Sequence, residues 1–406
     1  MSGPQQGRPG PKPKREQSGK RDQPQTIDGT ASRQVALDAL VAIEADGSYA
    51  NLALGPILAA SKLDERDRRL VTELVYGTIR RRRSLDYLVD RFLVSDPPAV
   101  AREALRLGAY QLRFTDVPDH AAVSATVEVT PKRFRGMVNA ILRKVATSPV
   151  TWPDDATRLS YPDWIVRTMT ADLGGADTFE ALETMNRAPE VSVRDDGYTQ
   201  DRSSQRVAEA LGAGPGQLLI DVCAAPGGKA TALAESGARV IAADLRPNRV
   251  RLIAGNARRT ASAHPAEAAV WPLIADAAHP PLRTGLADGV LVDAPCSGLG
   301  VLRRRPDARW RISAGDVGRL AVLQRELLEA SLPLVRPGGV LVYSVCTLTV
   351  AETTAVADAF GSDHPELIAD PVREYPWTEW GSGSLLLPQA DDSDGMAMFR
   401  WRVPAL

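Results

Sequence analysis

The alternation of short apolar runs with helix-length segments in the second half most constrains what this 406-residue chain can fold into. Strands that alternate with helices in this way are expected to pair in parallel and to be covered by helices. Two more runs near the end flank an acidic turn and predict a hairpin that closes the sheet. Residues 191–406 are therefore predicted to form an α/β domain. Its expected strands are Leu218–Cys223, Arg239–Asp244, Trp271–Ala275, Gly289–Asp293, Val340–Val345, Ser384–Leu387 and Met396–Arg402.

The first half has a different pattern, because its apolar residues recur at helical spacing. This spacing predicts an all-helical domain over residues 31–150, with one apolar face on each helix. Frequent prolines then interrupt the pattern, so residues 151–190 are expected to form a linker or small connecting subdomain. Residues 1–30 are rich in Pro, Gly, Gln and basic residues, and this composition predicts a disordered basic tail.

Charge is divided unevenly between the two halves, although the whole chain has a net charge of −1. Residues 1–150 hold 24 Lys and Arg against 17 Asp and Glu, whereas residues 151–406 hold 25 against 33. A polyanion would therefore meet the first half more readily. No apolar run approaches the ~18 residues that span a bilayer, and the N-terminus lacks the apolar core of a secretion signal. We expect a cytoplasmic protein that binds no membrane.

Only three cysteines occur in the chain, Cys223, Cys296 and Cys346. Three thiols are too few for a disulfide framework or a four-cysteine zinc site, and we expect no metal. An isolated cysteine is most often a small buried hydrophobic residue. Cys296 and Cys346, however, each follow the end of a predicted strand. If those strands are neighbours, about 4.8 Å apart, the two thiols face one substrate.

The first predicted strand runs into a turn with two adjacent glycines, Asp221–Lys229, which leads to a helix. Adjacent glycines let a ligand approach the backbone closely, so the turn is predicted to be a cofactor loop. It lacks the leading glycine and the final Ser or Thr of a Walker A loop, and its glycines do not have the G-x-G-x-x-G spacing. A phosphate cradle is therefore disfavoured. The residues assigned to cofactor binding are Cys223, Ala224, Ala225, Pro226, Gly227, Gly228 and Lys229.

Three aspartates, Asp244, Asp276 and Asp293, stand at the ends of the second, third and fourth predicted strands. Each alone could be a cap or turn residue, but ligands bind beyond the carboxyl ends of parallel strands, where these carboxylates should converge. The carboxylate of Asp244 could accept both ribose hydroxyls of an adenosine-containing cofactor. A carboxylate cluster repels a pyrophosphate but suits the cationic sulfonium of S-adenosylmethionine, which is therefore favoured over NAD.

Two thiols, a carboxylate and a methyl donor together suit methylation at carbon 5 of a pyrimidine. That carbon is a poor nucleophile until a thiolate adds to carbon 6 and turns the ring into an enamine. A carboxyl group near ring nitrogen 3 assists by protonating or hydrogen-bonding it, and a base then removes the proton from carbon 5. Asp293 and the second cysteine are the candidates for these two tasks.

Three motifs, Asp-Val-Cys-Ala-Ala-Pro-Gly-Gly-Lys, Asp-Ala-Pro-Cys-Ser-Gly and Val-Tyr-Ser-Val-Cys-Thr, occur in that order. They resemble those of the RNA 5-methylcytosine methyltransferases, and most closely the bacterial Sun/RsmB branch. Leu70–Arg80 and Gly136–Arg143 resemble the NusB-like RNA-binding domain of that branch. The resemblance implies a Rossmann-like S-adenosylmethionine-dependent methyltransferase domain behind a NusB-like helical domain. It also implies small-subunit (16S) ribosomal RNA as the substrate, and we expect a monomer.

The resemblance also implies roles for single residues. By position, Cys346 resembles the nucleophile that adds to carbon 6, and Cys296 resembles the cysteine that assists product release. Val345 and Thr353 stand where the family usually has Thr and Asn. The family's S-adenosylmethionine site corresponds to residues 223–229, Asp244, Asp276 and Asp293.

Two arginine-rich segments are candidates for contact with RNA. Arg80–Arg83 could contact phosphates, or it could end a helix, where cations meet the helix dipole favourably. Arg303–Trp310 follows the Pro-Cys turn directly, and we expect its arginines and tryptophan to grip phosphates and stack on bases. Because the target base must leave its stack to react, the sequence favours single-stranded or loop RNA.

Three other functions remain open from the sequence. A DNA cytosine methyltransferase would use the thiol of the Pro-Cys turn as its nucleophile. A non-catalytic adapter built on the NusB-like half would bind RNA without any dependence on a cofactor. An NAD oxidoreductase is a more distant alternative, which the carboxylates at the strand ends disfavour. Methylation assays with RNA and DNA, together with titration by S-adenosylmethionine, would separate these functions.

Overall fold

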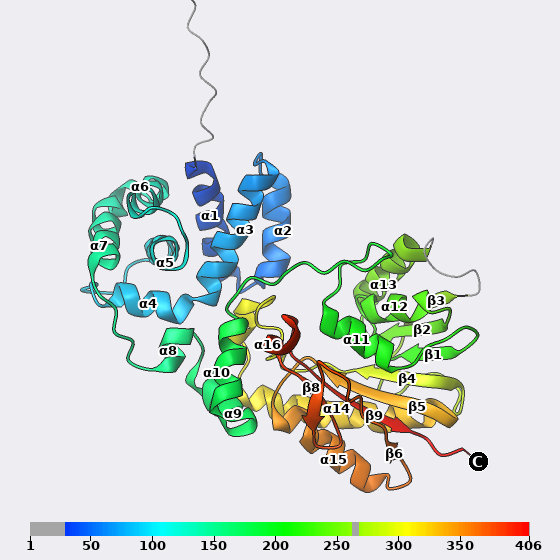
Figure 1. The fold of residues 1–406 in the computed structure, drawn as a ribbon. Helices are drawn as coiled ribbons and strands as arrows, with labels where there is room; N and C mark the ends of the chain where they lie inside the picture. The colour runs from blue at the N-terminus through cyan, green and yellow to red at the C-terminus, as the bar shows by residue number, and fades with distance from the viewer. Residues whose placement is uncertain (1–28, 262–267, 406) are drawn as a thin grey trace, which may run out of the picture.

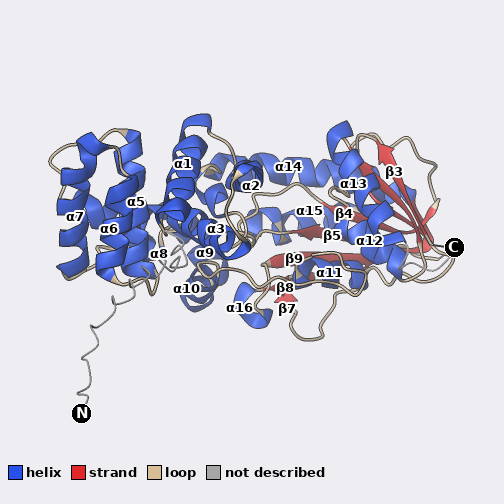
Figure 2. Cartoon of the chain, turned by 90° about the horizontal axis from the view of Figure 1, so that it is seen from above, coloured by secondary structure: helices blue, strands red, loops and turns tan. Residues whose placement is uncertain are grey.

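The computed structural model describes residues 29–261 and 268–405, so residues 1–28 of the predicted basic tail lie outside the described residues. Within the described chain, a helical domain stands beside one end of a domain built on a sheet (Figure 1). Seen from above, the two domains lie at opposite ends of an elongated molecule (Figure 2). No helix among the described residues is long and apolar enough to cross a membrane.

The helical domain confirms the helix pattern predicted for the first half. Asp64 begins one of its helices by accepting a hydrogen bond from the Asp67 N–H at 2.8 Å, which satisfies a free donor of the first turn. Leu74, Leu105 and Val138 from three different helices are fully buried in its core. The helices are α1 (Thr30–Asp46), α2 (Ala50–Ala60), α3 (Glu65–Arg80), α4 (Arg82–Asp90), α5 (Ala99–Phe114), α6 (Asp119–Val129) and α7 (Arg135–Thr147), with the short 3-10 helix η1 (Lys132–Phe134).

The proline-rich connection contains three helices, α8 (Asp155–Leu159), α9 (Asp163–Leu173) and α10 (Gly175–Thr184). The prolines lie between these helices and not within them, and Pro162 directly precedes α9. Tyr161, Ile165 and Met169 are fully buried in the same apolar core as the strands of the sheet domain. The connection is therefore attached to the sheet domain through a shared core.

The sheet has the order β3-β2-β1-β4-β5-β9-β8-β7, with β6 also paired to β9. The first five strands are parallel, as predicted, and β9 runs antiparallel to both β5 and β8. The predicted hairpin is thus confirmed, whereas the short strands β6 and β7 were not predicted. The strands are β1 (Leu218–Asp221), β2 (Arg239–Asp244), β3 (Ala269–Ile274), β4 (Ala287–Asp293), β5 (Val335–Val345), β6 (Ile368–Ala369), β7 (Thr378–Trp380), β8 (Gly383–Leu386) and β9 (Met396–Arg402).

Helices cover both faces of the sheet because consecutive residues of its strands point to opposite sides. Leu219 and Leu291 pack with α11, α12 and α13, whereas Ile220 and Val290 pack in the core that includes α14 and α15. These fully buried runs are typical of parallel strands. The helices of this domain are α11 (Arg202–Ala210), α12 (Gly228–Glu235), α13 (Pro247–Thr260), α14 (Ala314–Ser331), α15 (Thr354–Asp363) and α16 (Pro388–Asp391), with 3-10 helices η3 (Pro306–Trp310), η4 (Leu332–Leu334) and η5 (Val350–Glu352).

The second arginine-rich segment forms the contact between the two domains. Arg309 is fully buried, and its guanidinium donates to the carbonyl oxygens of Arg80 and Ser160 at 3.2 and 3.1 Å. The Trp310 indole donates to the Ile79 carbonyl at 2.9 Å, and Arg80 donates to the Arg303 carbonyl at 3.1 Å. The prediction that this segment contacts RNA is therefore wrong for Arg303 and Arg309, because both side chains are buried and their guanidinium groups bind other parts of the protein. Arg309 joins the two domains, whereas Arg303 donates to the Ser393 carbonyl at 3.3 Å within the sheet domain. Trp310 is half-buried, and its indole N–H is used in the domain contact.

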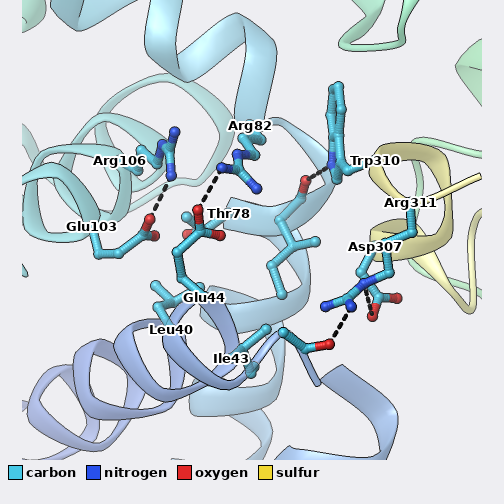
Figure 3. Close-up of a pocket in the computed structure, with 12 residues that line it drawn as sticks. Leu40, Ile43, Glu44, Thr78, Arg82, Glu103, Arg106, Asp307, Trp310 and Arg311 are labelled. Carbon is cyan, nitrogen blue, oxygen red and sulfur yellow. Dashed lines mark hydrogen bonds and ion pairs between the residues drawn. The ribbon is translucent and has the colours of Figure 1, made fainter. Parts of the chain in front are cut away.

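A cavity of about 220 Å³ lies beside this contact, between α1, α3 and η3 (Figure 3). The charged side chains around it are paired with one another, since Arg82 contacts Glu44 and Arg106 contacts Glu103. Arg311 donates to the backbone of the loop after α1. Because the cations at this cavity already have partners, we interpret the cavity as part of the contact between the helical domain and the sheet domain.

Candidate active site

The two cysteines predicted to act together do lie together. β4 pairs in parallel with β5, and Asp293 is opposite Ser344 in that register. The loops that follow these strands bring the Sγ atoms of Cys296 and Cys346 to 3.3 Å from each other. Both side chains are only partly buried, which leaves them accessible to a substrate.

The loops of the two cysteines are packed tightly against the turn before β9. The Gly300 N–H donates to the Cys346 carbonyl at 2.9 Å, and the Gly395 N–H donates to the Gly300 carbonyl at 2.8 Å. A Cβ atom at Gly300 would lie 2.2 Å from the Gly395 carbonyl oxygen, so only glycine fits there. The final hairpin therefore helps to fix the position of both thiols.

The surroundings of the two thiols shift their pKa values in opposite directions. The hydrogen bond with Cys296 lowers the pKa of Cys346 most, against the effects of burial and of Asp293. The positive charges of Lys229 and Arg305 lower it further. The same contact with Cys346, together with burial, raises the pKa of Cys296 well above its ordinary value. Cys346 is therefore the stronger candidate for a thiolate nucleophile.

Asp293 lies between the cofactor loop and the cysteines. Its Oδ2 accepts from the Lys229 ammonium at 2.7 Å, and its Oδ1 accepts from the Ser344 hydroxyl at 2.8 Å. Lys229 is almost fully buried, and burial alone would lower the pKa of its ammonium. The charge of Asp293 and the hydrogen bond to it, with smaller effects of Cys346 and Asp221, together raise that pKa. The lysine therefore holds a positive charge beside both the carboxylate and the Cys346 thiol.

The cofactor loop follows β1 and leads into α12, as the sequence predicts. Gly227 adopts a positive φ of 107°, and a Cβ atom there would lie 3.2 Å from the Cα of Ile253 on α13. The Asn256 amide donates to the Pro226 carbonyl at 2.8 Å, and Arg249 donates to the Ala225 carbonyl at 2.8 Å. The loop is thus held against α13, with its two glycines at the start of α12.

Asp221, at the end of β1, is a site residue that the sequence analysis left unassigned. Its Oδ2 is buried and has no hydrogen-bond partner among the described residues. Burial, followed by repulsion from Asp293, raises the pKa of Asp221 to about 8. A cation placed beside this carboxyl would relieve both effects. The sulfonium and amino groups of S-adenosylmethionine fit this requirement, and a dinucleotide pyrophosphate does not.

The remaining predicted cofactor residues differ in their surroundings. Asp244 is buried, contacts Arg249 at 3.3 Å, and is close enough to raise the pKa of Asp221 as well. Asp276 is exposed, and its Oδ1 accepts from the Ala278 N–H at 3.0 Å. Burial raises the pKa of the Cys223 thiol strongly, so this cysteine stays protonated. Asp244 therefore joins Asp221 and Asp293 in one acidic cluster, whereas Asp276 stands at the edge.

Comparison with known proteins identifies both domains. The family model of the 16S rRNA methyltransferase RsmB/F matches residues 208–401, and the model of the NusB family matches residues 30–147. A ribosomal RNA small subunit methyltransferase B of Thermus thermophilus is 37% identical to this chain, with 87% of this chain and 94% of that protein covered. A methyltransferase homologue of Mycobacterium tuberculosis is 38% identical, with 81% and 86% covered.

Solved structures agree on the fold. The crystal structure of PH0851 has a TM-score of 0.72 at 21% identity and covers 93% of this chain and 99% of its own. A methyltransferase homologue from Pyrococcus horikoshii has a TM-score of 0.50 at 21% identity, and it covers 62% of this chain and 100% of its own.

The fold and the site therefore define an S-adenosylmethionine-dependent methyltransferase with a NusB-like helical domain. Within that class, the chain belongs to the RsmB family of 16S rRNA methyltransferases.

Proposed function

We propose that the protein transfers a methyl group to carbon 5 of a cytosine in RNA, with Cys346 as the nucleophile. The observation that carries this proposal is the pair of thiols 3.3 Å apart, whose pKa values move in opposite directions beside Lys229 and Asp293. Addition of a thiolate to carbon 6 is the step that a pyrimidine needs before carbon 5 can take up a methyl group. A methyltransferase that modifies an oxygen or nitrogen atom would not need two thiols in this arrangement.

In the first step, the Cys346 thiolate forms a C–S bond to carbon 6, and the electron pair of the C5–C6 double bond moves to carbon 5. Lys229 favours this step in advance by stabilising the thiolate. Asp293, in its protonated form, donates a hydrogen bond to ring nitrogen 3, which gains electron density as the C–S bond forms. S-adenosylmethionine supplies the electrophilic methyl group, which carbon 5 then receives.

In the last step, a base removes the proton from carbon 5, the double bond re-forms, and the Cys346 thiolate leaves. We assign the base to Cys296. The largest cause that raises the pKa of Cys296 is its hydrogen bond with Cys346. That cause disappears once Cys346 is bonded to carbon, so the pKa of Cys296 falls at the stage when a base is required. Cys296 then gives its own proton to solvent, and the resulting thiolate takes the proton from carbon 5.

We assign ribosomal RNA of the small subunit as the substrate. The relative from Thermus thermophilus carries that substrate in its name, and the same two domains are present here. Arg305 is the exposed arginine of its segment, and it is close enough to Cys346 to lower the pKa of that thiol. Its guanidinium is thus available to a phosphate next to the target nucleotide.

The direct test is methyl transfer from labelled S-adenosylmethionine to unmodified 16S ribosomal RNA and to DNA of the same sequence, followed by nucleoside analysis. We expect label in 5-methylcytidine from the RNA alone. Label in DNA alone, or in a nucleoside other than 5-methylcytidine, would overturn the proposal. RNA binding without any binding of S-adenosylmethionine would identify a non-catalytic adapter instead.

A further inference from the structure

A buried carboxylate, Glu352, joins the loops of the two cysteines and has no part in the steps described above. Glu352 ends η5 and is fully buried. No ion pair of this side chain occurs among the described residues, so neutral hydrogen-bond donors alone compensate for its burial. Such a group is costly to bury unless its oxygens are well satisfied.

Both carboxylate oxygens of Glu352 accept several hydrogen bonds. Oε1 accepts from the Ser297 N–H at 2.8 Å and from the Gln324 amide at 3.1 Å. Oε2 accepts from the Ser297 hydroxyl, and from the hydroxyls of Thr347 and Thr349 at 3.2 Å each. Five donors from three separate segments of the chain thus converge on one side chain.

Two of these partners are the residues directly after the two cysteines. Ser297 follows Cys296, Thr347 follows Cys346, and their hydroxyl oxygens lie 2.8 Å apart. We propose that Glu352 is a positioning residue that sets the distance and direction between the two active-site thiols. This inference rests on the proposed function, because only a mechanism that uses both thiols requires a fixed distance and direction between them.

Residues outside the two cysteine loops also hold Glu352 in place. Gln324 of α14 donates to Glu352 and also to the Pro295 carbonyl, at 2.9 Å, just before Cys296. The Tyr343 hydroxyl contacts the Gln324 side-chain oxygen at 2.9 Å and the Glu352 carbonyl at 2.6 Å. Among the described residues, none of these groups forms a hydrogen bond or ion pair with the cofactor loop, so loss of Glu352 should leave cofactor binding intact.

The test compares Glu352→Ala with Glu352→Gln, and uses Glu326→Ala on the exposed face of α14 as the matched control. The Gln amide can still accept from the Ser297 N–H through its oxygen, and two of the three hydroxyls can turn to accept from the two hydrogens of its NH₂ group. The alanine variant keeps neither set of contacts. A positional role therefore predicts rescue by Gln, although Gln carries no charge.

The first readout is independent of activity. Diamide oxidises two neighbouring thiols to a disulfide, and peptide mapping measures how fast the Cys296–Cys346 bond forms. We expect Glu352→Ala to slow this reaction roughly tenfold or more, while Glu352→Gln and Glu326→Ala react as the unchanged protein does. An unchanged rate in Glu352→Ala would overturn the inference.

The second readout is turnover. We expect kcat of Glu352→Ala to fall about 100-fold, since a misplacement of about 1 Å costs that much, with little change in KM or in the affinity for S-adenosylmethionine. Glu352→Gln should stay within roughly fivefold of the unchanged protein. If Glu352→Gln loses turnover as fully as Glu352→Ala while its thiols still couple rapidly, charge rather than position matters and the inference is wrong.

A third variant covers the case in which Glu352→Ala does not fold. Ser297→Ala combined with Thr347→Val removes two hydroxyl contacts but keeps the Ser297 N–H and Gln324 bonds to the carboxylate. We expect it to slow disulfide formation severalfold, and an unchanged rate counts against the inference. Absence of methyl transfer by the unchanged protein would instead refute the proposed function, which separates the two failures.

Discussion

Cys346 and Cys296 occupy equivalent places in the sheet, each in the loop after one of two paired strands, yet their surroundings differ. Lys229 and Arg305 lower the pKa of Cys346, whereas the charge of Glu352 is among the causes that raise the pKa of Cys296. The hydrogen bond between the two thiols is the largest single cause of both pKa shifts, and the neighbouring charges act in the same direction. Equivalent positions in a fold therefore do not give equivalent chemistry, because the charges from neighbouring segments decide which thiol becomes the nucleophile.

Among the substitutions that test this comparison, removal of the nucleophile should have the largest effect on methyl transfer. Cys346→Ala should reduce methyl transfer to less than roughly one ten-thousandth of the unchanged rate, because no other group can form the C–S bond. Binding of S-adenosylmethionine should persist, as titration calorimetry can check. Full activity of Cys346→Ala would show that the roles of the two cysteines have been assigned wrongly.

Removal of the second cysteine should have a smaller effect, and one of a different kind. In Cys296→Ala the C–S bond still forms, but the base for the last step is absent, so turnover should fall by about 10²–10⁴-fold. A covalent protein–RNA adduct should then accumulate and be visible on a denaturing gel. A Cys296→Ala protein that turns over normally, with no adduct, would contradict the role of this thiol in release.

The charge of Lys229 offers a finer test of why the two thiols differ. Lys229→Met removes a cause that lowers the pKa of Cys346, so that pKa rises and the acidic limb of the pH–rate profile moves toward higher pH. At neutral pH, the rate should fall on the order of tenfold. Lys229→Arg keeps the positive charge and serves as the control. The explanation fails if the limb stays in place in Lys229→Met.

Substitution of Arg305 should have the smallest effect on methyl transfer. Arg305→Gln removes an exposed charge that acts on Cys346 from a distance, and we expect a fall in kcat/KM of about two- to fivefold. If Arg305 also contacts a phosphate, the slope of RNA affinity against salt concentration should decrease by about 1. Arg309→Gln is not a suitable control, because that side chain joins the two domains. Identical salt slopes would remove Arg305 from the RNA interface.

The sequence predicted the parallel sheet and the meeting of the two cysteines because both depend on local patterns. Apolar runs define the strands, and the carboxyl ends of neighbouring parallel strands share one edge. Glu352 could not be found in this way, since its five donors come from segments that only the folded chain brings together. In the sequence it is one acidic residue among threonines and small apolar residues.

The arginines of the domain contact show a second limit of sequence patterns. A run of arginines is usually solvated or bound to phosphate, and this expectation led to the wrong prediction for Arg303 and Arg309. Both are buried because backbone carbonyl groups accept their hydrogen bonds, that of Ser393 in the sheet domain for Arg303 and those of Arg80 and Ser160 at the domain boundary for Arg309. Burial lowers the pKa of Arg309 to about 10, and its guanidinium also lies over the ring of Tyr161 at 3.9 Å. No periodic pattern marks such free carbonyl groups in advance.

The central claim is that sulfur at position 346, and not at position 296, bonds to the pyrimidine ring. A cytosine that carries fluorine at carbon 5 cannot lose a proton there, so RNA that contains 5-fluorocytosine should trap the protein after methyl transfer. Protease digestion and mass spectrometry of the trapped complex then identify the modified peptide. The account predicts the nucleotide on the peptide that contains Cys346, and a nucleotide on the peptide that contains Cys296 would contradict it.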